Sequence, residues 1–453
     1  MFRLLLQKIL CSVLILCCGV GAALAKQSSY EPTAENLKAR EWFQDAKFGV
    51  FIHWGVSSSM AGGGRPGASE WIMEYQKIPI DKYERMASYF NPTEFDAEEW
   101  VKAFKSAGAK YVTFTAKHHD GFAMFDSKAT DYDIVDRTQF KRDIVKELKE
   151  ACDKYGLKLF FYYSQLDWHH PDYYPRGETG NAYTGRPEAG DWDKYIDFQN
   201  AQLKELLTNY GEVGGVWFDG WWDHKDTDYS NKWRLNETYE LIHKLQPQAL
   251  VINNHHAKTP FPGEDVQPFE QDLPGQNHSG FNTQDVSQNL PLEMAQTMNG
   301  AWGFNLIDDG FKSTKELIQT LVRAAGSNSN YLMNTGPMPN GLLQPENIQT
   351  YKEMGEWMNI YGDSIYGTRG GPISPRSWGV TTIKKNKLYV HVLDWKDELL
   401  FVPTGELQVQ NARLLRDGRK IKFEQTIKGT TISIPKGELS EWDTVIVFDL
   451  VTN

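Results

Sequence analysis

Residues 214–223 read GGVWFDGWWD, an apolar strand that runs into a group of tryptophans. Successive side chains of a strand point to opposite faces, so Trp217 and Asp219 share one face and their apolar neighbours share the other. Asp219 therefore leaves the end of a buried strand on the same side as an indole ring, a placement suited to chemistry. The alternative is that Asp219 only caps the turn at Gly220, as Asp before Gly often does.

Strand-like and helix-like segments alternate on both sides of this stretch. Apolar strands are predicted at residues 47–55, 110–115, 157–163, 214–219, 250–253 and 331–334, and helices at 37–43, 96–107, 142–154, 192–210, 232–245, 314–325 and 345–361. This alternation is typical of parallel strands joined by crossover helices, and it predicts an α/β fold with a (β/α)8-like barrel. Residues 260–300 lack periodicity and are expected to form a long functional loop.

The two ends of the chain differ from its middle. Arg3 and Lys8 precede an apolar run that ends at Ala25, which predicts a cleaved secretory signal over residues 1–25. A lipid anchor would need a small residue before Cys17 or Cys18, and a retained membrane anchor would be short. Short alternating segments near the C-terminus predict an antiparallel β-sandwich over 366–453, after a catalytic domain over 26–365. We expect an exported protein, either periplasmic or extracellular, without a membrane anchor.

Charge and cysteine content narrow the class of partner. The sequence has a formal net charge of −11, and loss of the signal removes two positive charges and no negative ones. An acidic chain argues against binding to nucleic acid or to anionic membranes, and an aromatic-rich one fits a neutral carbohydrate. Only Cys152 lies outside the predicted signal, so no disulfide can form within the mature chain.

Polar residues stand at the ends of several predicted strands, namely His53, His118, His119, Asp219 and His255. In parallel barrels the catalytic groups come from the C-terminal ends of different strands. Because these side chains converge on one rim, the functional interpretation of Asp219 is favoured over the turn.

Two chemistries use such a rim. Zinc could take His53, the 118–120 triplet HHD and His255 as ligands. Adjacent histidines at a strand end are expected to point to different sides, however, so we predict no metal or other cofactor. A retaining glycosidase instead needs a nucleophilic carboxylate and a second carboxylic acid roughly 5 Å away, and Asp219 supplies the first.

Four motifs carry a family resemblance: KFGVFIHWG at 47–55, KHHDGF at 117–122, WFDG at 217–220 and LMNTGP at 332–337. Together they resemble the α-L-fucosidases of glycoside hydrolase family 29. The resemblance implies a retaining exo-hydrolase that releases terminal α-linked L-fucose from oligosaccharides or glycoconjugates, with a catalytic barrel followed by a β-sandwich.

The same resemblance implies roles for individual residues. Asp219 matches the nucleophile, and the tyrosine beside the nucleophile belongs to the pair at 162–163. Tyr163 is expected to be that tyrosine because it is nearer the C-terminal end of its strand. Other residues expected to bind the fucose are His53, Glu70, Trp71, His118, His119, Trp217, His255 and Trp302.

One position departs from the family pattern. The residues LPGQN at 273–277 put Gln276 where the resemblance implies a glutamate that acts as acid/base. An amide has no titratable proton, so general acid catalysis worth about 10²–10⁴-fold would be lost. Gln276 is then an engineered substitution or a natural loss of activity, or else Glu264 or Glu270 does this work. A fucose-binding protein of the same fold with little turnover is the alternative function.

Overall fold

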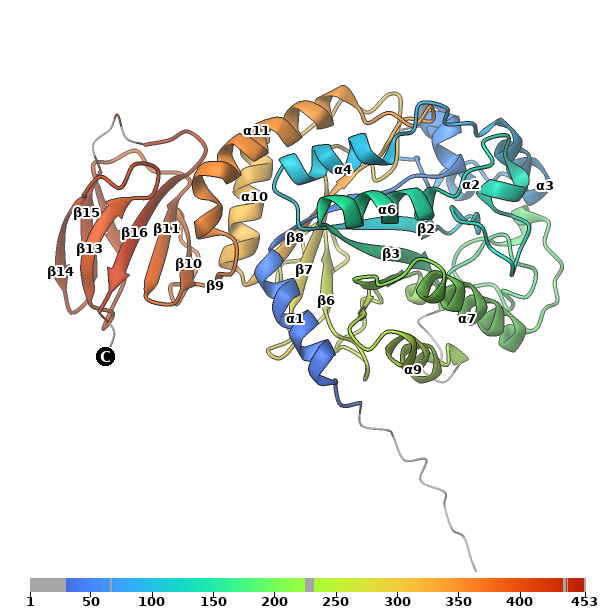
Figure 1. Ribbon diagram of the computed structural model, residues 1–453, viewed down its shortest axis with the longest axis horizontal. Helices are drawn as coiled ribbons and strands as arrows, with labels where there is room; N and C mark the ends of the chain where they lie inside the picture. Colours follow the sequence, from blue (N-terminus) through green and yellow to red (C-terminus); the bar gives the residue numbers. More distant parts are fainter. Residues whose placement is uncertain (1–29, 66, 225–231, 435–436, 438, 452–453) are drawn as a thin grey trace, which may run out of the picture. The chain divides into compact units, whose positions relative to one another are not determined.

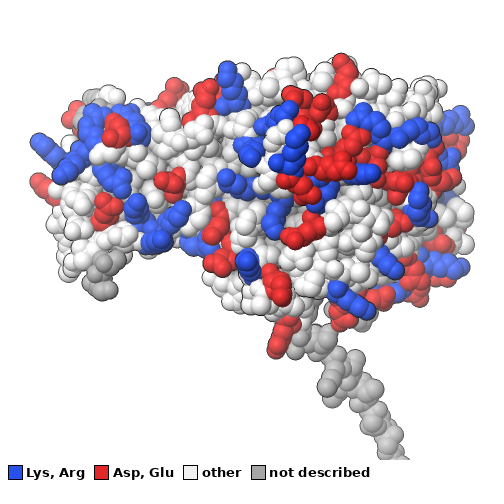
Figure 2. Space-filling model, viewed as in Figure 1, with Lys and Arg blue, Asp and Glu red and all other residues white. Residues whose placement is uncertain are grey.

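The computed structural model describes residues 30–65, 67–224, 232–434, 437 and 439–451. The predicted signal at 1–25 lies outside these residues. No helix within the described ranges has the length and apolar character needed to cross a membrane. On the face shown in Figure 2, acidic and basic side chains are interspersed.

Eight parallel strands form the predicted barrel (Figure 1). Their order in the sheet is β5-β4-β3-β2-β1-β8-β7-β6. The strands are β1 (Phe48–Ile52), β2 (Tyr111–Lys117), β3 (Lys158–Ser164), β4 (Gly215–Asp219), β5 (Leu250–Asn253), β6 (Gln267–Glu270), β7 (Leu292–Thr297) and β8 (Ser329–Thr335). The predicted (β/α)8-like architecture is confirmed, although between β5 and β6 the described residues form no ladder and β5 is bridged only to Val266, just before β6.

Helices surround these strands (Figure 1). The long ones are α1 (Ala34–Ala46), α4 (Ala97–Ser106), α6 (Ile144–Tyr155), α7 (Trp192–Thr208), α9 (Leu235–Leu245), α10 (Thr314–Gly326) and α11 (Pro345–Tyr361). Short helical turns lie mostly in the loops, as α2 (Ile72–Tyr75), α3 (Ile80–Tyr83), α5 (Ile134–Arg137), η1 (Val56–Gly64), η2 (Glu84–Tyr89), η3 (Ala182–Thr184), η4 (Trp221–His224) and η5 (Gly362–Ser364). Asp96, Asp143 and Asp191 cap α4, α6 and α7 by accepting hydrogen bonds from main-chain N–H groups of the first turn.

The interior of the barrel is filled by alternate side chains of its strands. Phe51, Trp217 and Leu332 are buried there, and Phe43 of α1 packs against Tyr111 with ring centroids 5.1 Å apart. The opposite faces of the strands pack on the helices in a separate core. Most of the strands are apolar on both faces, so their polar groups stand mainly at the ends. Glu293 of β7 is an exception, because it is buried and accepts hydrogen bonds from Tyr111 and Trp217.

The prediction of a long loop over residues 260–300 is wrong, because this segment contains β6 and β7. β6 is only QPFE and includes a proline, and β7, LEMAQT, alternates in polarity. Neither has the signal of a buried strand. Pairing of β7 with β6 and β8 makes them strands, so tertiary context overrides local pattern.

The C-terminal part is the predicted antiparallel sandwich. One sheet, in the order β13-β16-β11-β10-β9, contains β9 (Arg369–Gly370), β10 (Gly379–Lys384), β11 (Lys387–Val392), β13 (Val409–Leu414) and β16 (Thr444–Leu450). The other, β12-β15-β14, contains β12 (Leu399–Val402), β14 (Lys422–Thr426) and β15 (Gly429–Ser433). Val390, Ile432 and Phe448 lie in an apolar core that belongs to this part alone. The predicted domain boundary at 365/366 falls between η5 and β9.

Candidate active site

A cavity of about 950 Å³ opens at the carboxyl ends of the barrel strands. All the predicted site residues except Tyr163 and Gln276 line it, namely His53, Glu70, Trp71, His118, His119, Trp217, Asp219, His255 and Trp302. The sequence prediction that polar strand ends converge on one rim therefore agrees with the geometry. This volume is far larger than a single monosaccharide needs, and it is in the range of ordinary ligand pockets.

Asp219 is the last residue of β4, between β3 and β5. Its Oδ2 accepts a hydrogen bond from the Tyr162 hydroxyl at 2.9 Å, and its Oδ1 accepts one from Trp222 Nε1 at 2.9 Å. A longer bond, 3.4 Å, comes from Asn254 Nδ2. These donors are all side chains, so the carboxylate is held toward the cavity and is not used to cap a turn.

The chain leaves Asp219 through a turn that only glycine fits. Gly220 has φ of +92°, and a Cβ at this position would lie 2.7 Å from the main-chain nitrogen of Leu166. A side chain there would be strained and would displace the loop that follows β3. Gly220 thus fixes the direction in which Asp219 is presented.

The pKa of Asp219 is raised above its ordinary value. Burial is the largest cause, and the negative charge of Glu270 is the next. Hydrogen bonds from Trp222 and Tyr162 act in the opposite direction and favour the charged form. Asp219 is therefore a carboxylate whose charge is sustained by specific donors in a poorly solvated place.

The prediction of Tyr163 as the tyrosine beside Asp219 is wrong. Tyr163 points to the helical shell, where its hydroxyl donates to Gln202 Oε1 at 2.7 Å. In the register of β3 with β4, Tyr162 lies opposite Trp217 and Tyr163 opposite Phe218. Because Trp217 and Asp219 share the cavity face, alternation along β3 puts Tyr162 on that face as well.

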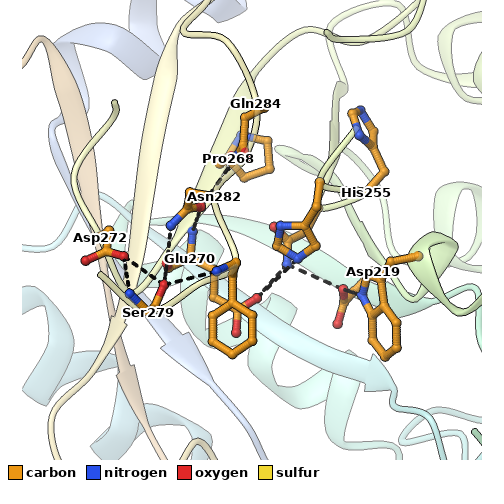
Figure 3. A network of polar contacts seen from close by, with 12 residues as sticks. Asp219, His255, Pro268, Glu270, Asp272, Ser279, Asn282 and Gln284 are labelled. Carbon is orange, nitrogen blue, oxygen red and sulfur yellow. Dashed lines mark hydrogen bonds and ion pairs between the residues drawn. The ribbon is translucent and has the colours of Figure 1, made fainter. Parts of the chain in front are cut away.

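Glu270 is the second carboxylate of the cavity and ends β6. Its Oε2 accepts a hydrogen bond at 2.9 Å from Asn254 Nδ2, the nitrogen that also contacts Asp219 Oδ1 (Figure 3). The two carboxylate oxygens can be no farther apart than these two distances added together. Asp219 and Glu270 therefore lie close enough to act on one glycosidic bond.

The other two acid/base candidates lie elsewhere. Gln276 is exposed on a turn, its main-chain N–H donates to the Leu273 carbonyl at 2.9 Å, and it does not line the cavity. Glu264 is buried behind the rim, where it contacts His255 Nε2 at 3.1 Å and accepts from the Tyr239 hydroxyl. The geometry contradicts the prediction for Gln276 and favours Glu270.

Burial keeps His53, His118 and His119 neutral. It lowers the pKa of His53 to about 3, and it holds the pKa values of His118 and His119 well below the ordinary one. The Asn334 amide donates to the Trp302 carbonyl, so its Oδ1 accepts from His53 Nδ1 at 2.6 Å. His53 Nε2 is then left as an acceptor, a role suited to a sugar hydroxyl.

His118 and His119 both line the cavity, contrary to the expectation that they point to different sides. The pairing of β2 with β3 shifts register between Thr115 and Lys117, just before the two histidines, and this bulge re-aims them. Their ring centroids are 4.2 Å apart. Across the described part of the chain, no three His, Cys, Asp or Glu side chains are grouped in a way that would hold a metal ion.

Glu70 provides a third carboxyl group, buried at the side of the cavity. Its Oε2 accepts from the Gly303 N–H at 2.8 Å, next to Trp302. Burial raises the pKa of Glu70 to about 7. Glu70 can therefore accept from or donate to a hydroxyl near neutral pH.

Aromatic rings form the walls. Trp71 and Trp222 are stacked with centroids 5.8 Å apart, and Tyr162 stacks on His118 at 5.2 Å. Farther out, Tyr75 and Phe281 line the cavity and are partly exposed. Sequence reasoning missed four residues that line the cavity: Tyr75, Trp222, Asn254 and Phe281. Trp222 lies in the tryptophan group after Asp219, Tyr75 ends the short helix α2, and Asn254 and Phe281 are loop residues without a local pattern.

Comparison with known proteins gives a consistent result. Residues 19–363 match the family model described as alpha-L-fucosidase. Human tissue alpha-L-fucosidase is 30% identical over 79% of this chain and 77% of its own length. Alpha-L-fucosidase isoenzyme 1 from Paenibacillus thiaminolyticus is 35% identical, with a TM-score of 0.82 over 92% of this chain and 100% of that one.

A solved structure from Bacteroides thetaiotaomicron bears on the chemistry. It is a family 29 alpha-L-fucosidase in a trapped covalent intermediate with 2-fluoro-fucosyl fluoride, obtained with a glutamate-to-glutamine mutant. It is 29% identical to this chain, with a TM-score of 0.81 over 92% of this chain and 96% of that one.

Proposed function

Because the chain belongs to the α-L-fucosidase family, glycoside hydrolase family 29, we propose that it hydrolyses terminal α-linked L-fucose with retention of configuration. Its substrates are fucosylated oligosaccharides or glycoconjugates. Asp219 is the nucleophile and Glu270 is the general acid/base. The observation that carries the proposal is the single Asn254 nitrogen in contact with both carboxylates.

The first step forms the fucosyl-enzyme. An Asp219 oxygen attacks the anomeric carbon of fucose, the bond from that carbon to the leaving oxygen breaks, and Glu270 gives its proton to the leaving oxygen. In the second step Glu270 takes a proton from water, the water oxygen bonds to the anomeric carbon, and the bond to Asp219 breaks. Fucose is released in its original α configuration, and both residues return to their starting states.

The surrounding residues support recognition of a neutral sugar. Neutral His53, His118 and His119 offer acceptor and donor nitrogens without a charge to desolvate. Glu70 completes the polar side, and Trp302 supplies an apolar face. Because Glu270 is available beside Asp219, the presence of glutamine at position 276 gives no reason to expect an inactive binding protein. We also propose that the N-terminal segment directs export of the protein.

Covalent trapping tests the nucleophile. We expect 2-fluoro-fucosyl fluoride to label the peptide that contains Asp219, with loss of fluoride, because the 2-fluoro group slows the second step. Peptide mass spectrometry locates the label, and the Asp219→Ala variant is the control that should remain unlabelled. A label on another residue, or release of the β anomer as the first product by NMR, would overturn the proposal.

A further inference from the structure

The strand that ends at Glu270 is paired with a full strand on one side only. Glu270 pairs with Ala295 of β7, and the N–H of Gln271 donates to the Ala295 carbonyl at 2.7 Å. On the other side, β5 is joined to the residues just before β6, by the isolated bridge of Ile252 with Val266 and by the Asp265 N–H, which donates to the Val251 carbonyl at 2.8 Å; among the described residues no ladder with β5 continues along β6 to Glu270. The main-chain N–H and C=O of Glu270 therefore face a gap in the barrel, where they need partners.

The side chain of Asn282 occupies that gap, and the Ser279 hydroxyl donates a longer bond, 3.4 Å, to the Glu270 carbonyl. Asn282 Oδ1 accepts from the Glu270 N–H at 2.9 Å, and Asn282 Nδ2 donates to the Glu270 carbonyl at 2.7 Å (Figure 3). Its carboxamide thus makes the pair of hydrogen bonds that a neighbouring strand would make. Gln284 extends the pattern, because its Nε2 donates to the Pro268 carbonyl at 3.1 Å.

Asn282 is itself held in place. It is 7% exposed, and its main-chain N–H donates to Asn277 Oδ1 at 2.9 Å. These residues belong to the β6–β7 loop, residues 271–291, which also contains Gln276. Asn282 is flanked in the chain by Phe281 and Thr283, and both of these line the cavity.

We infer that Asn282 is a positioning residue for the acid/base: it replaces the missing strand and keeps the Glu270 carboxylate beside the leaving oxygen. The inference rests on the proposed role of Glu270. Without Asn282 the end of β6 loses two main-chain partners, and a shift of about 1 Å is enough to cost roughly 10²-fold in rate. Asn282 holds the main chain of Glu270 and not the carboxylate of Asp219, so only proton transfer should suffer.

The positioning role of Asn282 can be tested by measuring kcat/KM on a series of fucosides with different leaving groups. Aryl α-L-fucosides with good leaving groups need no proton in the first step, whereas phenyl fucoside and fucosylated oligosaccharides do. For Asn282→Ala we expect kcat/KM to fall by about 10–100-fold on the poor leaving groups and by less than about threefold on an activated aryl fucoside. Gln288→Ala is the matched control, because Gln288 is an exposed amide of the same loop whose side chain donates to the carbonyl of nearby Val286.

Two further variants separate the possible failures. Glu270→Ala, measured in parallel, must show the same dependence on the leaving group; if it does not, the proposed acid/base is wrong. If Glu270→Ala shows this dependence on the leaving group and Asn282→Ala loses activity equally on all substrates, or not at all, only the positioning role of Asn282 is overturned.

Adding Asn282→Ala to Glu270→Ala should cause no further loss on poor leaving groups. Should Asn282→Ala fail to fold, Asn277→Ala removes one support of Asn282 and should give a weaker form of the same pattern.

Discussion

The two carboxylates of the site are supported in different ways. Asp219 ends a strand that is paired on both sides, and side chains of β3 and η4 donate to its oxygens. Glu270 ends a strand at the gap of the barrel, and its main chain is held by an amide side chain of a loop. The proposed nucleophile is thus held by side chains of the barrel, while the proposed acid/base depends on the β6–β7 loop.

The largest effect should come from removing Glu270. Glu270→Ala is expected to lower kcat/KM on oligosaccharides by about 10²–10⁴-fold, because the leaving oxygen would depart without a proton. An activated aryl fucoside should still form the fucosyl-enzyme, which then accumulates and appears as a burst of aryl alcohol in stopped-flow measurements. Equal loss on both substrates would mean that Glu270 serves a purpose other than proton transfer.

The support of Asp219 can be weakened without touching its carboxylate. Tyr162→Phe removes a hydrogen bond to a charged group, which is typically worth about 1.5–3 kcal/mol, so kcat/KM should fall by roughly 10–100-fold. Tyr163→Phe is the control: it removes a buried bond to Gln202 and should lower the Tm by a few degrees while activity changes less than about twofold. The reverse result would restore Tyr163 as the residue beside the nucleophile.

The hydrogen bonds to Asp219 predict a change in pH dependence. The active form of Asp219 is the carboxylate, so kcat/KM falls as the pH decreases through its raised pKa. The hydrogen bond from the Tyr162 hydroxyl favours the charged form and so lowers this pKa. In Tyr162→Phe the acidic limb measured with an activated aryl fucoside should therefore move to higher pH. An unchanged limb would show that the Tyr162 hydroxyl does not act on the charge of Asp219.

Gln276 should show the smallest effect, although it shares a loop with Asn282. Its side chain is exposed and outside the cavity. Activity of Gln276→Glu on an oligosaccharide is expected to stay within about twofold of the parent. A gain of more than tenfold would instead return the acid/base to position 276.

The sequence predicts the barrel and the position of Asp219 at a strand end in the cavity well, because both depend on local signals. Each early strand is a continuous apolar run that ends in a polar residue, and Asp219 follows the clearest of them. Tyr162 was also within reach, since the alternation that places Trp217 beside Asp219 also places Tyr162 when β3 and β4 are in register. The choice of Tyr163 used nearness to the strand end instead of the face.

The same reasoning named Glu270 only as one of two alternatives to Gln276, and it did not find Asn282. β6 has four residues and a proline, so nothing in QPFE marks Glu270 as a strand end on the rim. The motif LPGQN drew the prediction to Gln276 because it resembles a family context in composition, whereas the position of a carboxylate depends on pairing across the sheet. Asn282 can support Glu270 only because there is a gap between β5 and β6. That gap exists only in the assembled barrel and has no signal in the local sequence.

The β6–β7 loop has a consequence for the redesign of this protein. Phe281 and Thr283 line the cavity, and Asn282 between them anchors the proton donor. An exchange of this loop to admit a different acceptor sugar would disturb acid catalysis at the same time, so variants selected for new linkages should keep an asparagine at 282. Residues that shape the substrate range and the residue that supports proton transfer therefore lie side by side in residues 281–283.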